Sequence, residues 1–310
     1  MKKFNIDFYK NKKVFFILSI AVIVVGLIFN LVFGAKLDIQ FAGGAMIKYS
    51  VDGEVDANEI ADLIQQETGR TVSVATNRSI GSDAYQITVS FAGNESVSLE
   101  EQQSIAKSLS DAYAERTFGV IESSSVDPTM GAKFFQKCLV CMVITFAILL
   151  AYIALRFRKI GGLSAGVTAI IALVHDVLIV YFVFVIFGFS INDVFIAVIL
   201  TIIGYSLNDT IVIYDRIREN RKLEPTKSAD ALPGIVNKSL NQTMARSIMT
   251  SVTTFLALLV IFIVASVYGL TTVKTFALPM MVGVIVGCYS SLCIAAPLYT
   301  MWVVNKAKKK

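Results

Sequence analysis

One carboxylate interrupts a long apolar stretch of this chain. Between Ile191 and Tyr214 the only charged side chains are Asp193, near the start, and Asp209. An apolar stretch of this length crosses a bilayer as a helix. A carboxylate at the centre of such a helix costs about 2.5–3.5 kcal/mol on insertion scales, so it normally faces other protein groups and has a function. Asp209 is therefore the first candidate for chemistry. Its structural alternative is a hydrogen bond that packs two helices together.

Polar side chains accompany Asp209 on its own predicted helix. From Thr201, steps of four and three lead to Tyr205 and Asn208. Helical spacing therefore places Tyr205 and Asn208 on the same side as Asp209, where we expect them to support it. Gly204 lies one turn before Asn208 and would let a neighbouring helix approach closely.

A second polar stripe carries a cation toward Asp209. Its members recur at steps of four, three, four and three, and they are Ser239, Thr243, Arg246, Thr250 and Thr253. Arg246 is predicted to enter the membrane from the side nearer to Asp209, so the two side chains could meet. A guanidinium favours the ionised carboxylate, whereas removal from water favours the protonated form. A carboxylate between these influences suits a proton relay, with Thr243 and Thr250 in support. The alternative for Arg246 is a helix-end cation that extends to water.

The pair His175 and Asp176 lies in the middle of another apolar stretch. Adjacent residues point to different sides of a helix, so the sequence predicts that they do not form a simple facing pair. One of them could still join the cluster around Asp209. Asp176 is therefore the third candidate for a proton pathway, after Asp209 and Arg246.

An intramembrane aspartyl protease is a different hypothesis for Asp176 and Asp209. Such enzymes need two carboxylates that share a proton. Against this hypothesis, the sequence has GYSLND where these proteases have GxGD, and Arg246 is a poor neighbour for a carboxylate that must be protonated. We therefore expect no enzymatic activity.

The sequence predicts no cofactor and no metal site. It contains no GxxxxGK[ST] phosphate-binding loop. Cys138 and Cys141 form a CxxC, but no second CxxC completes a zinc site, and the one His lies elsewhere. All four cysteines fall in predicted membrane spans, where Cys behaves as a small apolar side chain.

The composition is that of an integral membrane protein, with 55% hydrophobic residues in 310. The net charge of +5 comes from basic residues at the ends of apolar stretches, as in cytoplasmic loops, so nucleic-acid binding is not expected. We predict a cytoplasmic segment 1–13, a first span 14–35, an outer domain 36–133, and a membrane domain 134–310 with a cytoplasmic carboxyl terminus. The remaining spans are predicted at about 138–155, 162–187, 191–214, 247–268 and 275–304.

The outer domain has an acidic excess and the patterns of a soluble α+β fold. Tyr85, Ile87, Val89 and Phe91 alternate as in a half-buried strand. The predicted order is strand 45–51, helix 56–68, strands 71–76 and 84–91, helix 99–117 and strand 120–126. This βαββαβ order indicates a small ferredoxin-like domain outside the cytoplasm.

Four stretches of the chain resemble one family. GYSLNDTIVIYDRIREN at 204–220 is similar to the signature of SecF, the smaller membrane subunits of the bacterial SecDF complexes. QFAGG at 40–44, GGLSAGVTAIIALVHDV at 161–177 and SLNQTMARSIMTSVTT at 239–254 resemble further elements of that family. Gln40 stands where the family usually has Asp.

The resemblance implies a fold of the resistance-nodulation-division type and a location in the bacterial plasma membrane. It also implies a SecD partner, work beside the SecYEG channel, and use of the proton-motive force to promote translocation of precursor polypeptides. By position, Asp209 resembles the family's proton-pathway aspartate and Arg246 its nearby arginine. The alternative function is half of a proton-coupled transporter for lipids or small molecules.

Overall fold

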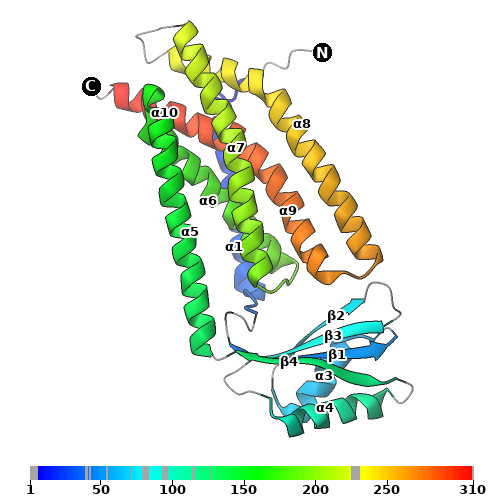
Figure 1. Cartoon of the computed structure of the whole chain (residues 1–310). Coiled ribbons are helices and arrows are strands. Elements are labelled where there is room, and N and C mark those ends of the chain that lie inside the picture. Colours follow the sequence, from blue (N-terminus) through cyan, green and yellow to red (C-terminus); the bar gives the residue numbers. More distant parts are fainter. Residues whose placement is uncertain are drawn as a thin grey trace.

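The computed structural model describes residues 6–38, 41, 43–53, 55–70, 72–78, 84–92, 97–113, 116–126, 128–224 and 231–308. Residues 40 and 42 of the QFAGG stretch lie outside these ranges. Within them, six helices are long and apolar enough to cross a membrane, and a small α+β domain is inserted between the first and second (Figure 1). The predicted fold class is therefore confirmed.

The membrane helices vary in length and regularity. They are α1 (Lys12–Phe33), α5 (Pro128–Arg156), α6 (Gly162–Ile186), α7 (Asp193–Leu223), α8 (Leu232–Val267) and α9 (Thr271–Ser290), which continues through a π-helical segment, Ser291–Ala295, into α10 (Ala296–Lys308). A proline cannot donate the backbone hydrogen bond of an α-helix, and its ring clashes with the carbonyl four residues earlier. For Pro297 that carbonyl belongs to Cys293, inside the π-helical segment. The irregularity of the last span therefore coincides with this proline.

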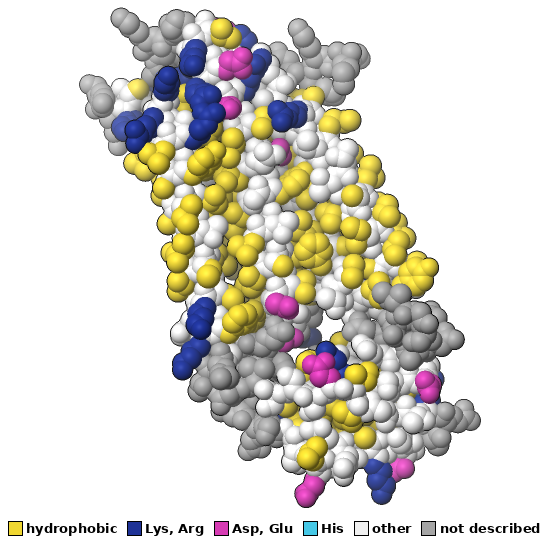
Figure 2. All heavy atoms as spheres, viewed as in Figure 1, with side chains coloured by type: hydrophobic (Ala, Val, Ile, Leu, Met, Phe, Trp, Pro, Cys, Tyr) yellow, Lys and Arg dark blue, Asp and Glu magenta, His cyan; other side chains and the backbone are white. Residues whose placement is uncertain are grey.

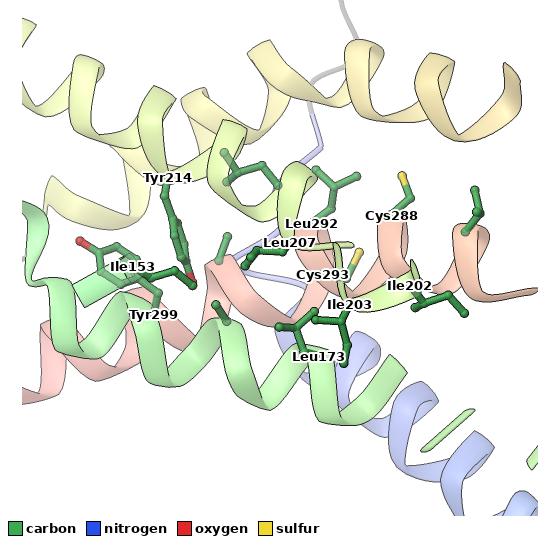
Figure 3. Close-up of a cluster of buried hydrophobic side chains, with 14 of the residues drawn as sticks. Ile153, Leu173, Ile202, Ile203, Leu207, Tyr214, Cys288, Leu292, Cys293 and Tyr299 are labelled. Carbon is green, nitrogen blue, oxygen red and sulfur yellow. The ribbon is translucent and has the colours of Figure 1, made fainter. Parts of the chain in front are cut away.

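Three helices form the buried centre of the bundle. Most side chains of α6 and about half of those of α7 are buried, whereas α1, α5 and α8 expose most of their surface. Figure 3 shows the apolar contacts that hold α6, α7 and α9 together, among them Leu173, Ile202, Ile203 and Cys288. Asp209 is therefore carried by a central helix.

The outer domain is a four-stranded antiparallel sheet with two helices on one face. Its elements are β1 (Gly44–Asp52), α3 (Ala57–Thr68), β2 (Val72–Arg78), β3 (Ala84–Ala92), α4 (Leu99–Ala112) and β4 (Phe118–Val126). The strand order β2-β3-β1-β4 and the βαββαβ sequence are those of the predicted ferredoxin-like fold. Alternate residues such as Ile47, Ile87 and Val89 are fully buried against the helices.

One predicted element of this domain was wrong in extent. The helix predicted over 99–117 ends at Ala112, because the chain turns at Tyr113, whose carbonyl accepts the backbone N–H of Arg116. The turn brings the ring of Tyr113 within 5.9 Å of Phe118, and β4 begins there instead of at Val120.

The sheet lies between its own helices and the membrane bundle (Figure 1). On the face shown in Figure 2, apolar side chains cover much of the middle of the bundle, and Lys and Arg side chains gather at the end far from the outer domain. This charge distribution is the one expected if that end faces the cytoplasm.

Candidate functional site

Asp209 is buried between α7 and α8. Asp209 is 6% exposed, and its Oδ2 atom has no hydrogen-bond partner among the described residues. Ser247 of α8 lies beside the carboxylate. The hydroxyl oxygen of Ser247 is also buried, and it has no hydrogen-bond partner among the described residues. An unpaired buried carboxylate oxygen is costly, so the position is unusual for a residue that only packs helices.

Arg246 lies close enough for its charge to act on Asp209. It is exposed on α8, and the two side chains form no ion pair within the ranges that the structure describes. The arrangement places a positive charge near the carboxylate without neutralising it by direct contact. A carboxylate with this environment is able to gain and lose a proton.

Of the supporting residues predicted from the sequence, the structure turns one toward the site and leaves the others away from Asp209. Tyr205 points toward the site, and its hydroxyl donates to Ser251 Oγ at 3.4 Å. Asn208 is exposed, because neighbouring residues on a helix lie about 100° apart and Asp209 takes the inward position. The hydroxyls of Thr243 and Thr250 donate to carbonyls of their own helix, at 3.0 Å and 3.1 Å respectively. They do not reach Asp209.

The buried polar stripe of α8 was only partly predicted. The side chains that turn inward are Ser239, Thr243, Ser247 and Ser251, spaced four residues apart. The predicted stripe shared its first two members and then continued through Arg246 and Thr250, each one residue before the buried serine. Repeated steps of four, visible in the sequence, were the signal that would have identified Ser247 and Ser251.

Asp176 lies in a separate buried cluster between α6, α7 and α9. It has no exposed surface, and its Oδ2 atom accepts hydrogen bonds from Ser206 Oγ at 2.6 Å and Ser290 Oγ at 2.7 Å. Its Oδ1 atom is 3.1 Å from Nδ1 of His175. The prediction that these neighbours form no pair was wrong, since Nδ1 lies near the base of the imidazole and can reach back to the adjacent carboxylate.

Hydroxyl groups extend this second cluster along α7. Thr210 and Ser291 share a hydrogen bond of 2.8 Å between their side-chain oxygens, and Ser291 also donates to the carbonyl of Ser206 at 3.2 Å. Ser206 lies one turn before Asp209, so the same helix carries both polar groups. These residues were not predicted from the sequence, although two successive serines in an apolar span, 290–291, were a visible signal.

The two carboxylates do not form a protease-like pair. Both oxygens of Asp176 are engaged by α6, α7 and α9 residues, whereas Asp209 faces α8. The geometry therefore gives no support to a shared proton between them.

A groove lies at the basic end of the bundle, and Arg246 is part of its lining. It has a volume of about 480 Å³ and lies between α7 and α8. Its lining includes Val212, Arg216, Glu219, Lys222, Gln242 and Arg246. Val212 lies one turn beyond Asp209, so water in the groove would come within about one helical turn of the carboxylate.

Comparison with known proteins identifies the family. The model described as "Protein export membrane protein SecD/SecF, C-terminal" matches residues 105–305. The chain belongs to the SecD/SecF family. It is 36% identical to the protein translocase subunit SecF of Petrotoga mobilis over 308 residues, which cover 98% of each chain. It is 33% identical to SecDF of Bacillus subtilis, covering 98% of this chain and 39% of that protein.

Solved structures of the family have the same architecture. SecDF of Thermus thermophilus matches with a TM-score of 0.77 and 27% identity, over 96% of this chain and 38% of the other. SecDF in its super-membrane-facing form matches with a TM-score of 0.69 and 26% identity, over 100% and 40% of the two chains. SecF subunits are components of protein export and not a family of catalytic enzymes. Like them, this chain is a multi-pass membrane protein of the bacterial Sec system.

Proposed function

We propose that this chain uses the proton-motive force, together with a SecD partner, to promote translocation of precursor polypeptides at the SecYEG channel. The observation that carries the proposal is Asp209, a buried carboxylate with an oxygen that has no partner among the described residues and with an arginine charge nearby. Such a group binds and releases a proton without breaking an ion pair. A groove lined by Arg246 and by Val212 lies about one helical turn from Asp209. The family match favours protein export over the lipid or small-molecule transporter alternative.

Three residues make up the proposed proton pathway. Asp209 is the coupling carboxylate, and the positive charge of Arg246 favours its ionised form. Asp176 is the second carboxylate, joined to the helix of Asp209 through Ser206. Tyr205 orients Ser251 beside the site.

The SecD partner covers the polar face that this chain leaves exposed. Gly204 and Asn208 of α7, and Arg246 and Thr250 of α8, are exposed on these two membrane helices. A Cβ built at Gly204 would have no described atom within 4 Å, so none of the described helices makes the close approach expected there. Polar groups facing lipid are unfavourable, and therefore this face suits a protein neighbour. The additional length of the SecDF relatives is consistent with a matching half in another chain.

The orientation follows from charge. The basic end of the bundle, with both described termini, lies in the cytoplasm, and the outer domain lies on the opposite side of the plasma membrane. The groove beside Arg246 then opens to the cytoplasm, and the outer domain meets the emerging precursor.

Precursor export into membrane vesicles with an imposed proton gradient tests this function. Wild type and Asp209→Asn are compared in the presence of SecD, with Asp193→Asn as the matched control, because Asp193 is exposed at the start of the same helix. We expect Asp209→Asn to abolish the gradient-dependent part of export and to leave ATP-driven translocation intact. Gradient-dependent export at the level of the control would contradict the proposal.

A further inference from the structure

The helix that carries Asp209 is continuous to its outer end. α7 contains 31 residues, Asp193–Leu223, and its first turn is capped by Asn192, whose side chain accepts the backbone N–H of Phe195. Asp209 lies 16 positions beyond Asp193, which places it about 24 Å from the outer end at 1.5 Å per residue. A shift of α7 near the carboxylate would therefore displace the outer end of the helix as well.

This outer end is joined by backbone hydrogen bonds to the linker that leads into the outer domain. The linker follows α1, whose C-cap Gly34 has a positive φ. The N–H of Ile191 donates to the carbonyl of Lys36 at 2.8 Å, and the N–H of Asp38 donates to the carbonyl of Ile191 at 3.1 Å. Leu37 and Ile191 thus form a short parallel β-bridge immediately before the α7 cap.

The same linker has a second anchor on α5. Phe41 is 3% exposed and lies between Phe134 and Phe135, with ring centroids 5.6 Å and 5.4 Å away. A Cβ added at Gly131 of α5 would be only 2.9 Å from the carbonyl of Phe41, so the backbones are in close contact. The linker is therefore held at both ends before β1 begins at Gly44.

The strand that follows the linker, β1, connects it to the rest of the outer domain. β1 is a central strand, hydrogen-bonded to β3 on one side and to β4 on the other. β4 leads directly into α5, whose first turns contact Phe41. Both connections between the outer domain and the membrane helices therefore meet at the linker, and the bridge at Ile191 joins this linker to the start of α7.

We propose that the β-bridge between Ile191 and Lys36–Asp38 transmits movement of α7 to the outer domain during export. This proposal rests on the proposed function, in which a change at Asp209 moves α7. The linker follows the outer end of the helix because two backbone bonds hold it there, and β1 follows the linker. Asp209 and the outer domain are then connected through one rigid helix and one bridge.

A proline pair tests the need for the bridge. Ile191→Pro removes the N–H that donates to Lys36. Ser190→Pro is the matched control, since the N–H of Ser190 makes no backbone hydrogen bond among those described for this loop. Both variants are reconstituted with SecD in vesicles, and gradient-driven export and proton entry are measured in the same preparation. We expect Ile191→Pro to lose most gradient-driven export, at least fivefold relative to Ser190→Pro, while proton entry continues.

A covalent bridge tests whether the contact persists through the cycle. In Leu37→Cys with Ile191→Cys, two added copper(II) phenanthroline complexes each accept one electron, the two thiol protons go to solvent, and the two sulfurs form a disulfide. We expect rapid cross-linking and export within twofold of the same double variant before oxidation. Loss of export on cross-linking, reversed by a reductant, would show that the bridge must open, and the proposal would fail.

The two proposals fail in different ways. If Ile191→Pro exports as well as Ser190→Pro, the bridge does not transmit movement, although Asp209 still couples the gradient. If Asp209→Asn exports normally, the coupling residue is wrong whatever the bridge does. Co-purification of each proline variant with SecD verifies that the helices have assembled, and the disulfide variant tests the bridge without removing any hydrogen bond.

Discussion

The carboxylate of Asp176 organises the centre of the bundle, and its removal should be costly. Two serine hydroxyls donate to it from other helices at 2.6 Å and 2.7 Å. A hydrogen bond contributes about 0.5–1.5 kcal/mol to stability, and a buried polar group left without a partner costs about 1–3 kcal/mol. Asp176→Ala deletes both and leaves Ser206 buried without this acceptor, while Ser290 keeps a weaker bond of 3.2 Å to the carbonyl of Gly287. We therefore expect a loss of about 3 kcal/mol or more.

The cysteines of the chain provide the assay. Cys288 and Cys293 are buried and become reactive to a thiol dye on unfolding, whereas Cys141 is exposed. In a background with Cys138 and Cys141 replaced by Ser, dye labelling during heating reports the unfolding of the bundle. At about 2–4 °C per kcal/mol, the expected destabilisation lowers Tm by about 6 °C or more.

Asp176→Asn separates structure from proton transfer. The amide oxygen of Asn can accept both serine hydroxyls, and its NH2 can donate to Nδ1 of His175, so Tm should remain close to that of wild type. A neutral amide does not exchange a proton, so gradient-driven export should fall. The exposed substitution Asp193→Ala is the thermal control. The reasoning is refuted if Asp176→Ala unfolds at the same temperature as this control.

Three further perturbations have defined outcomes. Gly162→Ala places a Cβ 2.0 Å from a backbone carbonyl of α5, so overpacking should destabilise the chain by about 1–3 kcal/mol in the thiol-dye assay. Gly204→Ala and Gly234→Ala meet no described atom within 4 Å, so both should fold, but only Gly204→Ala should weaken co-purification with SecD. The pKa of Asp7 is lowered by the backbone N–H three residues later and by the amide of Asn237. Its contribution to holding the amino terminus on α8 is complete above about pH 3.8 and is lost as the pH falls through the lower folded-state value, which spin-label mobility at the amino terminus should report.

The burial of Asp209 could be predicted from the sequence, because a carboxylate that faces lipid has a high free energy and is therefore expected to face other protein groups. The six helices and the βαββαβ domain were predictable for a similar reason: apolar runs of membrane length and strict alternation such as that of β3 each fit one kind of element. These predictions depend on period and length, which a single sequence contains.

The partners of the carboxylates depended on packing that the sequence does not specify. Arg246 and Ser247 are neighbours about 100° apart on α8, and the pattern of steps allowed either one to face inward. Asn208 was assigned to the site because its spacing fits, but on α7 it lies on the face exposed in this chain. The bond between His175 and Asp176 arose from side-chain rotamers, which helical periodicity does not contain.

The most direct measurement of the central claim is proton entry into vesicles that contain this chain with SecD, reported by a pH-sensitive dye in the lumen under an imposed gradient. We expect proton entry in wild type and in Asp193→Asn, and none above the protein-free background in Asp209→Asn. Proton entry in Asp209→Asn at the wild-type rate would contradict the assignment of Asp209 as the coupling carboxylate.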